Sequence, residues 1–368
     1  MRILQVLPHL SKGGAERVVV ELSNALHESG HDVTLLLAYP VNYELNQKDL
    51  DPRIQVRFVS KRRGNRFLQY FKVPFWILRN WQTLRNYDVI HCHLTYGLIF
   101  GFFVSILRRL SPTKRPRLIA TCHVVGVGVT RVPRVLNERL SYFFDAFVLM
   151  AQDGQWRSFI SRKRRTNIHI IVNGITPSVL GSEANQLSTS SPFIVGTISR
   201  LQAERKPWLF LEVFAHIQDL APQEVKFVLG GEGPEREHLN ALSEKLKLTT
   251  SLSMPGLVKN PSMFLKDIVL YVTLNVEGIT GIAGLEAVFS GIPVVGIQLS
   301  PAYTNGSNDW IWSHQDPKSV AKKIVELLGN PVELKAVADN QYRIANEKFS
   351  IDRMKNDYVN LYEKIESK

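Results

Sequence analysis

Short apolar segments of strand length alternate with amphipathic helical segments along nearly the whole 368-residue chain. The first strand-like segment, Arg2–Leu7, precedes a helical stretch at Glu16–Ser29 in which Leu22 and Leu26 share one face. Further strand-like segments are Val33–Leu37, Val89–Cys92, Leu118–Cys122, His169–Val172, Phe193–Ile198, Lys226–Leu229, Ile268–Leu274 and Pro293–Val295. Repeated strand–helix units predict parallel sheets with helices on both faces, and therefore an α/β fold.

The length and one break in the pattern predict two domains. A chain of 368 residues is too long for one ordinary core. Residues 178–192 are small, polar and aperiodic, so we interpret them as a linker between domains at 1–177 and 193–350. A last helical segment occupies residues 351–368.

The charge is unevenly distributed. Residues 1–176 carry 26 Lys/Arg against 11 Asp/Glu, whereas the remaining residues carry 19 against 22. A basic first half and a slightly acidic second half predict domains with different partners. The only cysteines, Cys92 and Cys122, offer no disulfide framework, and the chain opens directly on a strand without a signal peptide. We therefore expect a cytoplasmic protein.

The segment 276–295 is the most informative motif. It places Glu277 and Glu286 around a glycine-rich turn that precedes a short apolar helix. Backbone N–H groups at a helix N-terminus bind phosphate, and carboxylates accept hydrogen bonds from hydroxyl groups. Together these features fit a sugar nucleotide.

A second cluster of charge follows the strand at Phe193–Ile198. Arg200 and a second cation, Arg205 or Lys206, lie on one strand–helix connection, where they can hold a diphosphate and neutralise a leaving group. A solvated surface run is the alternative interpretation. The glycine-rich turn at Gly231 follows a later strand in the same way.

The first half contributes three strand-end motifs. Gly13 and Gly14 follow the first strand without matching the dinucleotide fingerprint, which argues against an NAD enzyme. His91 and His93 end one strand and His123 ends another, and we expect His91 and His93 to point to opposite faces. The histidines lack a third ligand with metal-binding spacing, so no metal site is predicted.

Taken in order, these motifs resemble the retaining glycosyltransferases of family 4, and the resemblance spans nearly the whole chain. The matching segments are Arg2–Leu4, Gly13–Arg17, Asp88–His93, Thr121–His123, Asn173–Ile175, Ser199–Pro207, Gly231–Pro234, Glu277–Ala287, Gly291–Val295, and a last segment with Phe349–Ile351, Met354, Tyr358, Leu361 and Tyr362. The resemblance implies the GT-B architecture, in which two Rossmann-like doubly wound domains face each other across a cleft. It also implies that the last helical segment, at 351–368, returns to the first domain.

The resemblance also implies roles for matched residues on the donor side. Glu286 would bind the ribose hydroxyls of a nucleotide sugar, and Glu277 would contact the transferred sugar. Backbone groups of Gly278, Thr280, Gly281 and Ile282 would bind the diphosphate, with Arg200 and Lys206 or Arg205 neutralising it. Eight residues separate the two glutamates, one more than the family usually has.

Across the cleft, the resemblance places Gly14 near the donor phosphate and His123 beside the sugar or its attacking acceptor. Gly13, His93 and Asn173 are assigned to the acceptor side. A nucleotide sugar donor and a sugar or lipid-linked acceptor are the expected substrates, with neither cofactor nor metal. The expected products are bacterial cell-surface polysaccharides, lipopolysaccharide or glycolipids.

A basic and aromatic stretch at residues 61–81 suits the surface of an anionic bilayer. We therefore expect a peripheral protein at the inner face of the membrane, whereas the alternative is a core helix with a solvated basic face. Two further alternatives for function remain open: a sugar-nucleotide epimerase of GT-B shape, and a basic nucleic-acid-binding protein without enzymatic activity. No nucleic-acid reader motif supports the latter.

Overall fold

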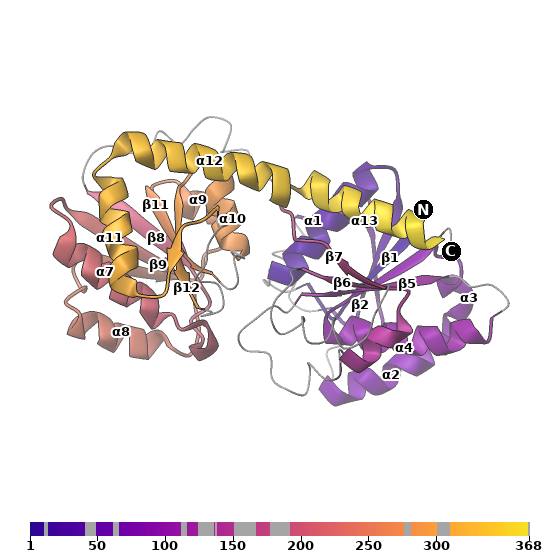
Figure 1. Cartoon of the computed structure of the whole chain (residues 1–368). Helices are drawn as coiled ribbons and strands as arrows, with labels where there is room; N and C mark the ends of the chain where they lie inside the picture. The colour runs from indigo at the N-terminus through magenta and orange to yellow at the C-terminus, as the bar shows by residue number, and fades with distance from the viewer. Residues whose placement is uncertain are drawn as a thin grey trace. The chain divides into compact units, whose positions relative to one another are not determined.

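The computed structural model describes residues 1–10, 14–40, 49–61, 66–111, 116–123, 136, 138–150, 167–176, 192–275, 281–299 and 310–366. The chain divides into two compact units (Figure 1). Unit 1 comprises Met1–Gly174 and Ile351–Lys368, and unit 2 comprises Ile175–Ser350. Each unit contains one parallel sheet with helices on both faces, so the prediction of two doubly wound α/β domains is confirmed.

The sheet of unit 1 has the strand order β3-β2-β1-β4-β5-β6-β7. Its strands are β1 (Arg2–Leu7), β2 (Asp32–Leu37), β3 (Gln55–Phe58), β4 (Val89–His93), β5 (Arg117–Cys122), β6 (Ala146–Leu149) and β7 (Ile168–Ile170). Its helices are α1 (Gly14–Glu28), α2 (Arg66–Arg79), α3 (Trp81–Leu84), α4 (Leu94–Arg109), the 3₁₀ turn η1 (Ser141–Phe143) and α13 (Ile351–Glu366). The order reverses direction between β1 and β4.

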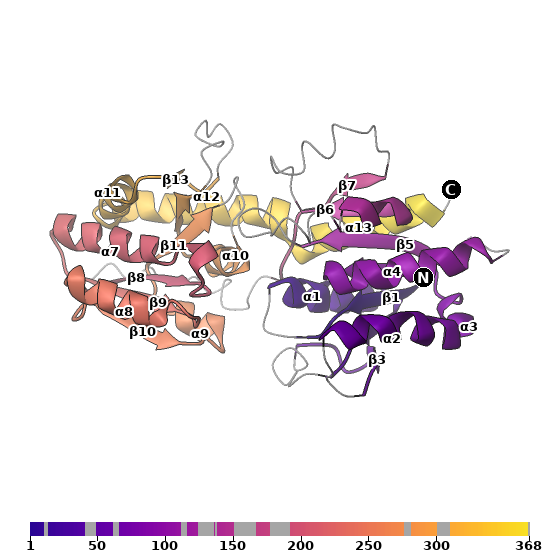
Figure 2. The same ribbon diagram turned by 90° about the horizontal axis from the view of Figure 1, so that it is seen from below.

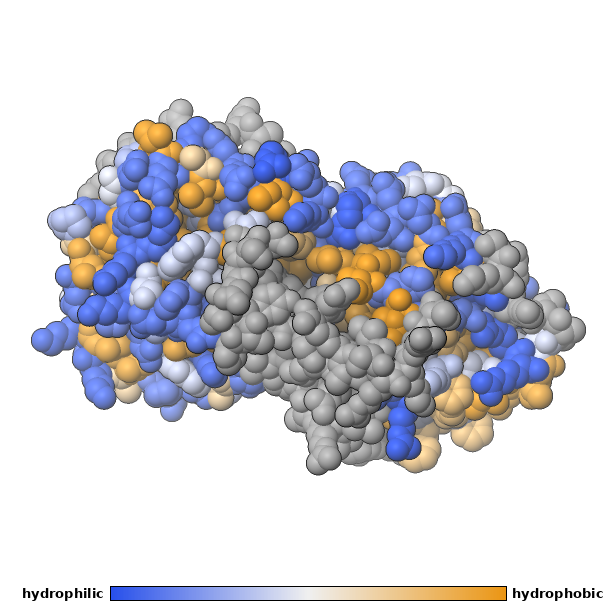
Figure 3. Space-filling view, in the orientation of Figure 1, coloured by the Kyte–Doolittle hydropathy of each residue, from blue (hydrophilic) through white to orange (hydrophobic). Residues whose placement is uncertain are grey.

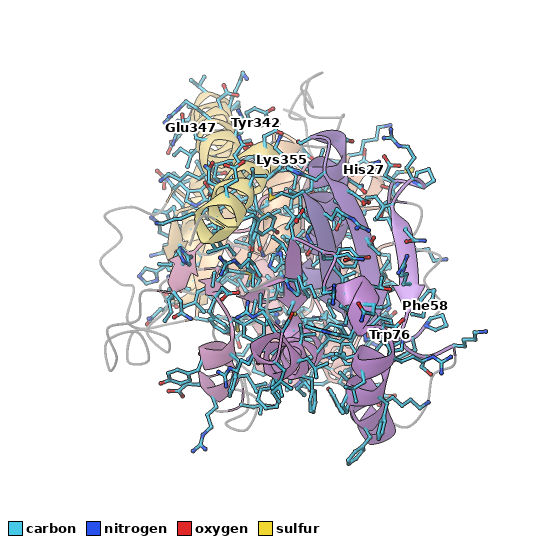
Figure 4. The ribbon with its side chains drawn as sticks, turned by 90° about the vertical axis from the view of Figure 1, so that its right-hand side faces the viewer. His27, Phe58, Trp76, Tyr342, Glu347 and Lys355 are labelled. Atoms are coloured by element: carbon cyan, nitrogen blue, oxygen red, sulfur yellow. The ribbon has the colours of Figure 1, made fainter. Side chains whose placement is uncertain are left out.

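Strand alternation divides the residues of unit 1 between two faces. Even-numbered residues such as Leu4, Cys92 and Ala120 pack in one apolar cluster with α2 and α4. The opposite face carries α1 and α13, and Figure 2 shows α2 and α4 nearer the viewer than α13. The edge-on view of Figure 4 labels Trp76 on α2 and Lys355 on α13, on opposite sides of the sheet.

The sheet of unit 2 has the order β10-β9-β8-β11-β12-β13 and reverses direction between β8 and β11. Its strands are β8 (Phe193–Ile198), β9 (Val225–Gly230), β10 (Leu252–Gly256), β11 (Leu270–Asn275), β12 (Val294–Gln298) and β13 (Ser313–His314). Its helices are η3 (Ala203–Arg205), α7 (Trp208–Leu220), α8 (Arg236–Lys245), α9 (Pro261–Leu265), α10 (Ile282–Phe289), α11 (Pro317–Leu328) and α12 (Pro331–Phe349). One core cluster lies under α7 and α11, and a second lies under α9, α10 and α12.

The structure adds four strands that the sequence pattern did not reveal, namely β3, β6, β10 and β13. Each is short, and β3 alternates only between exposed and partly buried residues, so it lacks the apolar run of a central strand. The predicted linker at 178–192 lies outside the described residues except for Pro192. The chain passes between the units at Gly174–Ile175 and at Ser350–Ile351, and Ile175 pairs with Ser350 in an isolated parallel bridge.

Candidate functional site

The loop after β8 occupies the position where open α/β sheets bind ligands. β8 pairs with β11, and the strand order reverses at this pair, so their carboxyl ends border the crevice that such a reversal creates. Arg200, Arg205 and Lys206 all lie on the β8–α7 connection and are all exposed. The prediction that these cations share one strand-end loop is therefore correct.

The positive charges of this loop are close enough to affect one another. Loss of surrounding water lowers the pKa of Arg205, and the positive charge of Arg200 lowers it further. Lys206 has left-handed backbone angles, φ 45° and ψ 52°, which cost a residue other than glycine about 1–2 kcal/mol. The loop therefore combines clustered positive charge with a strained backbone at Lys206.

The turn at Gly231 supports this loop. Ser199 N–H donates to the carbonyl of Gly230 at 2.9 Å, and Leu201 N–H donates to that of Glu232 at 3.0 Å. Gly231 has φ +140°, and a Cβ at this position would lie 1.8 Å from the carbonyl oxygen of Ser199. Gly231, a predicted donor-binding residue, therefore lies in close backbone contact with Ser199, the residue before Arg200.

Helix α10 carries Glu286, the second carboxylate of the 276–295 motif. Gly281 is its N-cap, Ile282 its first residue, and Glu286 is only 9% exposed. A helix N-terminus leaves backbone N–H groups without intrahelical partners and carries positive dipole character. Glu277, Gly278 and Thr280 lie outside the described residues.

Tyr271 of β11 connects the two halves of this site, and the sequence analysis missed it. Its hydroxyl accepts a hydrogen bond from Ile198 N–H at 2.9 Å, at the end of β8. Burial raises the pKa of Tyr271, and the negative charge of Glu286 raises it further. The sequence signal for Tyr271 was a tyrosine within the apolar strand that precedes the glycine-rich turn.

In unit 1, His91 and His93 share one face of β4, so the expectation of opposite faces is wrong. Residues two apart along a strand point the same way, and the two ring centroids are 4.0 Å apart. His91 is fully buried; its Nδ1 pairs with the hydroxyl of Tyr362 at 2.8 Å and its Nε2 with that of Thr121 at 2.7 Å. The Thr121 hydroxyl also pairs with that of Tyr358, which anchors α13 on the sheet.

His93 joins His123 in a second branch of this polar cluster. Nδ1 of His93 lies 2.8 Å from Nε2 of His123, and Nε2 of His93 lies 2.6 Å from Oε1 of Gln5. Burial lowers the pKa of His91 and His93 well below the usual range, and lowers that of His123 to about 4. All three rings are therefore neutral at neutral pH.

The other predicted residues of unit 1 lie at the carboxyl ends of its strands or beside α13. Gly14 is exposed and begins α1, whereas Gly13 lies outside the described residues. Asn173 is partly buried, and the N–H of the following Gly174 lies 3.1 Å from Sδ of Met354 on α13. His93, assigned to the acceptor side, is only 1% exposed, and its ring is hydrogen-bonded to that of His123.

The described part of the chain contains no group of three or more His, Cys, Asp or Glu side chains arranged to hold a metal ion. The polar cluster of unit 1 also contains Gln5, which the motifs did not single out, and Tyr358 and Tyr362 of the C-terminal matching segment. A lone glutamine within the apolar strand Arg2–Leu7 was the sequence signal for the first. For Tyr358 and Tyr362 the structure adds their partners, Thr121 and His91.

Comparison with known families accounts for both units. Residues 12–179 match the model of Glycosyltransferase Family 4, and residues 192–330 match that of Glycosyl transferases group 1. The chain is a group 1 glycosyltransferase of the family 4 type. The fold and enzyme class that the sequence resemblance implied are therefore confirmed.

Known relatives of this glycosyltransferase are distant, and they cover most or all of its length. It is 24% identical to the GalNAc-alpha-(1->4)-GalNAc-alpha-(1->3)-diNAcBac-PP-undecaprenol alpha-1,4-N-acetyl-D-galactosaminyltransferase of Campylobacter jejuni, over 100% of this chain and 99% of that protein. It is also 23% identical to the 2-deoxystreptamine N-acetyl-D-glucosaminyltransferase of Niallia circulans, over 78% of this chain and 75% of that protein.

Solved structures share the fold of this glycosyltransferase. HepE of Anabaena in complex with UDP-glucose has a TM-score of 0.75 at 19% identity, covering 99% of this chain and all of that chain. TarM of S. aureus in complex with UDP has a TM-score of 0.71 at 13% identity, covering 98% and 99%. These similarities identify the GT-B fold, and membership of a glycosyltransferase family favours sugar transfer over the epimerase and nucleic-acid alternatives.

Proposed function

We propose that this glycosyltransferase moves a sugar from a nucleoside diphosphate sugar to an acceptor hydroxyl, with retention of anomeric configuration. The observation that carries the proposal is the clustering of Arg200, Arg205 and Lys206 after β8, where the strand order of unit 2 reverses. Helix α10, with its buried Glu286, follows β11 at the same reversal. The HepE and TarM structures contain UDP, which supports a nucleotide donor. The undecaprenol-linked substrate in the name of one relative supports a lipid-linked acceptor, in cell-surface glycan synthesis.

The chemistry follows from where charge develops. Breaking the bond between the sugar and the diphosphate leaves negative charge on the leaving group. Arg200 and Lys206, with the N-terminus of α10, would stabilise that charge without a metal ion. Glu286 would accept hydrogen bonds from the ribose hydroxyls, and His123 would contact the sugar or its acceptor.

A thermal-shift screen with UDP, GDP and ADP sugars tests the proposal. We expect one nucleotide to stabilise the wild type and Glu286→Gln to lose most of that stabilisation, because the amide keeps the shape of the side chain and removes its charge. Glu347→Gln is the control, since Glu347 is an exposed carboxylate on α12 paired with Arg343. The absence of a shift with every nucleotide sugar would contradict the proposal.

We further propose that α2 rests on an anionic membrane surface. Phe71, Phe75 and Leu78 are 72%, 74% and 59% exposed, whereas Val73 and Ile77 are fully buried in the core. The exposed side also carries Lys72 and Arg79, and Figure 3 shows apolar residues in orange where Figure 1 places α2. Among the described residues, no helix combines the length and apolar character needed to cross a bilayer. Rings at the interface and cations at the headgroups fit a peripheral protein at the inner face of the membrane.

Sedimentation with vesicles tests this second proposal. Phe71→Ser and Phe75→Ser should each weaken binding to vesicles containing phosphatidylglycerol about 10-fold, because each removes a large apolar side chain from the interface. Met263→Ser is the matched control, since Met263 is 70% exposed on α9 of unit 2. Equal sedimentation of all variants would refute membrane contact through α2. Arg62, Arg63 and the side chain of Arg66, which extend the basic stretch, lie outside the described residues.

A further inference from the structure

A hydrogen-bonded row of side chains crosses three neighbouring strands of unit 1. The sheet order places β1, β4 and β5 side by side, and Gln5, His93 and His123 lie on or directly after them. Gln5 pairs in register with His91, and His93 with Thr121. The row runs from Gln5 Oε1 to His93 Nε2 at 2.6 Å, and from His93 Nδ1 to His123 Nε2 at 2.8 Å.

The chemistry of each atom gives this row a direction. An amide oxygen can only accept, so Nε2 of His93 carries the proton that it donates to Gln5. A neutral imidazole has one donor and one acceptor nitrogen, so Nδ1 of His93 must accept. Nε2 of His123 therefore donates, and its Nδ1 keeps a lone pair. That Nδ1 is buried and has no hydrogen-bond partner among the described residues.

The surroundings keep every ring in the row neutral, as this direction requires. Burial is the main cause of the lowered pKa values of His93 and His123, and the nearby His91 is affected in the same way. From α13, Tyr358 and Tyr362 are hydrogen-bonded into this cluster, and burial raises the pKa values of both. No anion among these groups competes for the proton between the two imidazoles.

The backbone next to His93 is strained. Leu94, the first residue of α4, has φ 59°, a left-handed value that is an outlier for a bulky residue. Helix α4 packs closely against β1 beside this junction, since a Cβ on Gly97 would meet the carbonyl oxygen of Val6 at 2.9 Å. Such strain persists where the surrounding structure over-determines it, and it is concentrated at functional sites. His93 is thus held in one position relative to Gln5 and His123.

We propose that Gln5 and His93 are positioning residues that hold His123 in the Nε2–H tautomer, so that its Nδ1 lone pair accepts a hydrogen bond from a hydroxyl group of a bound sugar. The contact with sugar rests on the proposed function, whereas the tautomer is a property of the free protein. His123 alone touches the ligand; Gln5 and His93 act through it. The arrangement makes His123 an acceptor before any substrate arrives, without reorganisation of the ring.

Long-range ¹H–¹⁵N correlation spectra of the full-length protein with ¹⁵N-labelled histidine test this tautomer directly. The His123 signals are assigned by their loss in His123→Asn. In the wild type we expect Nε2 to be protonated and Nδ1 to be unprotonated. Gln5→Met keeps the length of the side chain and removes its acceptor, so it should populate the second tautomer of His123. A protonated Nδ1 in the wild type, or an unchanged tautomer in Gln5→Met, would overturn the proposal.

Two further variants complete the test. Gln341→Met is the matched control, because Gln341 is also buried and makes two hydrogen bonds of 2.8 Å with the backbone of Val294 in unit 2. It should lose stability without altering the His123 signals. Gln5→Glu keeps an acceptor at the same position, so at alkaline pH it should preserve the wild-type tautomer even if Gln5→Met fails to fold. A changed tautomer in Gln341→Met, or a lost one in Gln5→Glu at alkaline pH, would count against the proposal.

The turnover number kcat separates a positioning role from a merely structural one. With the donor identified by the nucleotide screen, Gln5→Met should reduce kcat about 10- to 100-fold while the affinity for the nucleoside diphosphate stays unchanged. Equal kcat in Gln5→Met and wild type would contradict the positioning role. Since the spectra need no substrate, a failure of the proposed sugar transfer is distinguishable from a failure of the tautomer assignment.

Discussion

Gly231→Ala should displace the loop that carries Arg200 from the turn at residues 230–232. A Cβ at Gly231 would lie 1.8 Å from the Ser199 carbonyl oxygen, and real Cβ contacts under 3.0 Å are essentially never observed. The two groups must therefore move apart by about 1.2 Å, which strains the hydrogen bonds from Ser199 N–H to Gly230 and from Leu201 N–H to Glu232. The left-handed backbone adds about 1–3 kcal/mol, and each weakened hydrogen bond adds about 1 kcal/mol.

We expect Gly231→Ala to lower the free energy of unfolding of unit 2 by about 3–5 kcal/mol in urea denaturation. A displacement of about 1 Å at Arg200 should also reduce kcat/KM roughly 100-fold. Gly291→Ala is the control: Gly291 has φ +74° and nothing within 4 Å of its Cβ position, so only the backbone cost of about 1–2 kcal/mol applies. If the two variants differ by less than about 1 kcal/mol, the inferred clash with Ser199 is wrong.

Three further predictions concern Lys206 and the histidine cluster. Lys206→Gly should raise the free energy of unfolding by about 1 kcal/mol, because glycine adopts a left-handed backbone without strain, yet it should weaken nucleotide-sugar binding in calorimetry. Lys206→Ala should weaken binding without raising the free energy of unfolding. Stabilisation by alanine would contradict backbone strain at Lys206. Tyr362→Phe should cost about 1–3 kcal/mol, seen as a lowered Tm, because it leaves Nδ1 of the fully buried His91 without its hydroxyl partner; an unchanged Tm would refute that bond. The folded-state pKa values of His91, His93 and His123 lie below the unfolded value, so their contribution to stability is complete above about pH 6.5 and is lost as pH falls towards 4. Urea unfolding across that range should therefore show a slope of up to about 1.4 kcal/mol per pH unit for each histidine, and a flat profile would show that the rings are not buried in neutral form.

The positions of the strand-end motifs could be predicted from local sequence pattern. Arg200 and Lys206 were predicted on one loop because a buried strand and a helix flank them in sequence, and the structure confirms that loop. Glu286 was predicted on a short apolar helix after a glycine-rich turn, and it lies on α10 (Ile282–Phe289), which follows Gly281. These inferences succeed because hydrophobic period and glycine position are properties of a dozen consecutive residues.

Other features depended on which strands are neighbours. His93 was assigned to the acceptor side, but β1 and β5 flank β4 and enclose His93 between Gln5 and His123. Tyr358 and Tyr362 lie more than 230 residues from their partners Thr121 and His91, so no local pattern connects them.

By itself, the sequence determined the α/β class, the existence of two units, the strand-end loops and the glycosyltransferase family, since each follows from short-range periodicity or from motifs read in order. Only the tertiary structure decided that Gly231 supports Arg200, that Tyr271 hydrogen-bonds with Ile198 within the field of Glu286, and that three histidines form one cluster. The physical reason is that crossover helices set the lateral order of parallel strands. Side chains distant in the chain are thereby brought within hydrogen-bonding distance, where burial fixes their protonation.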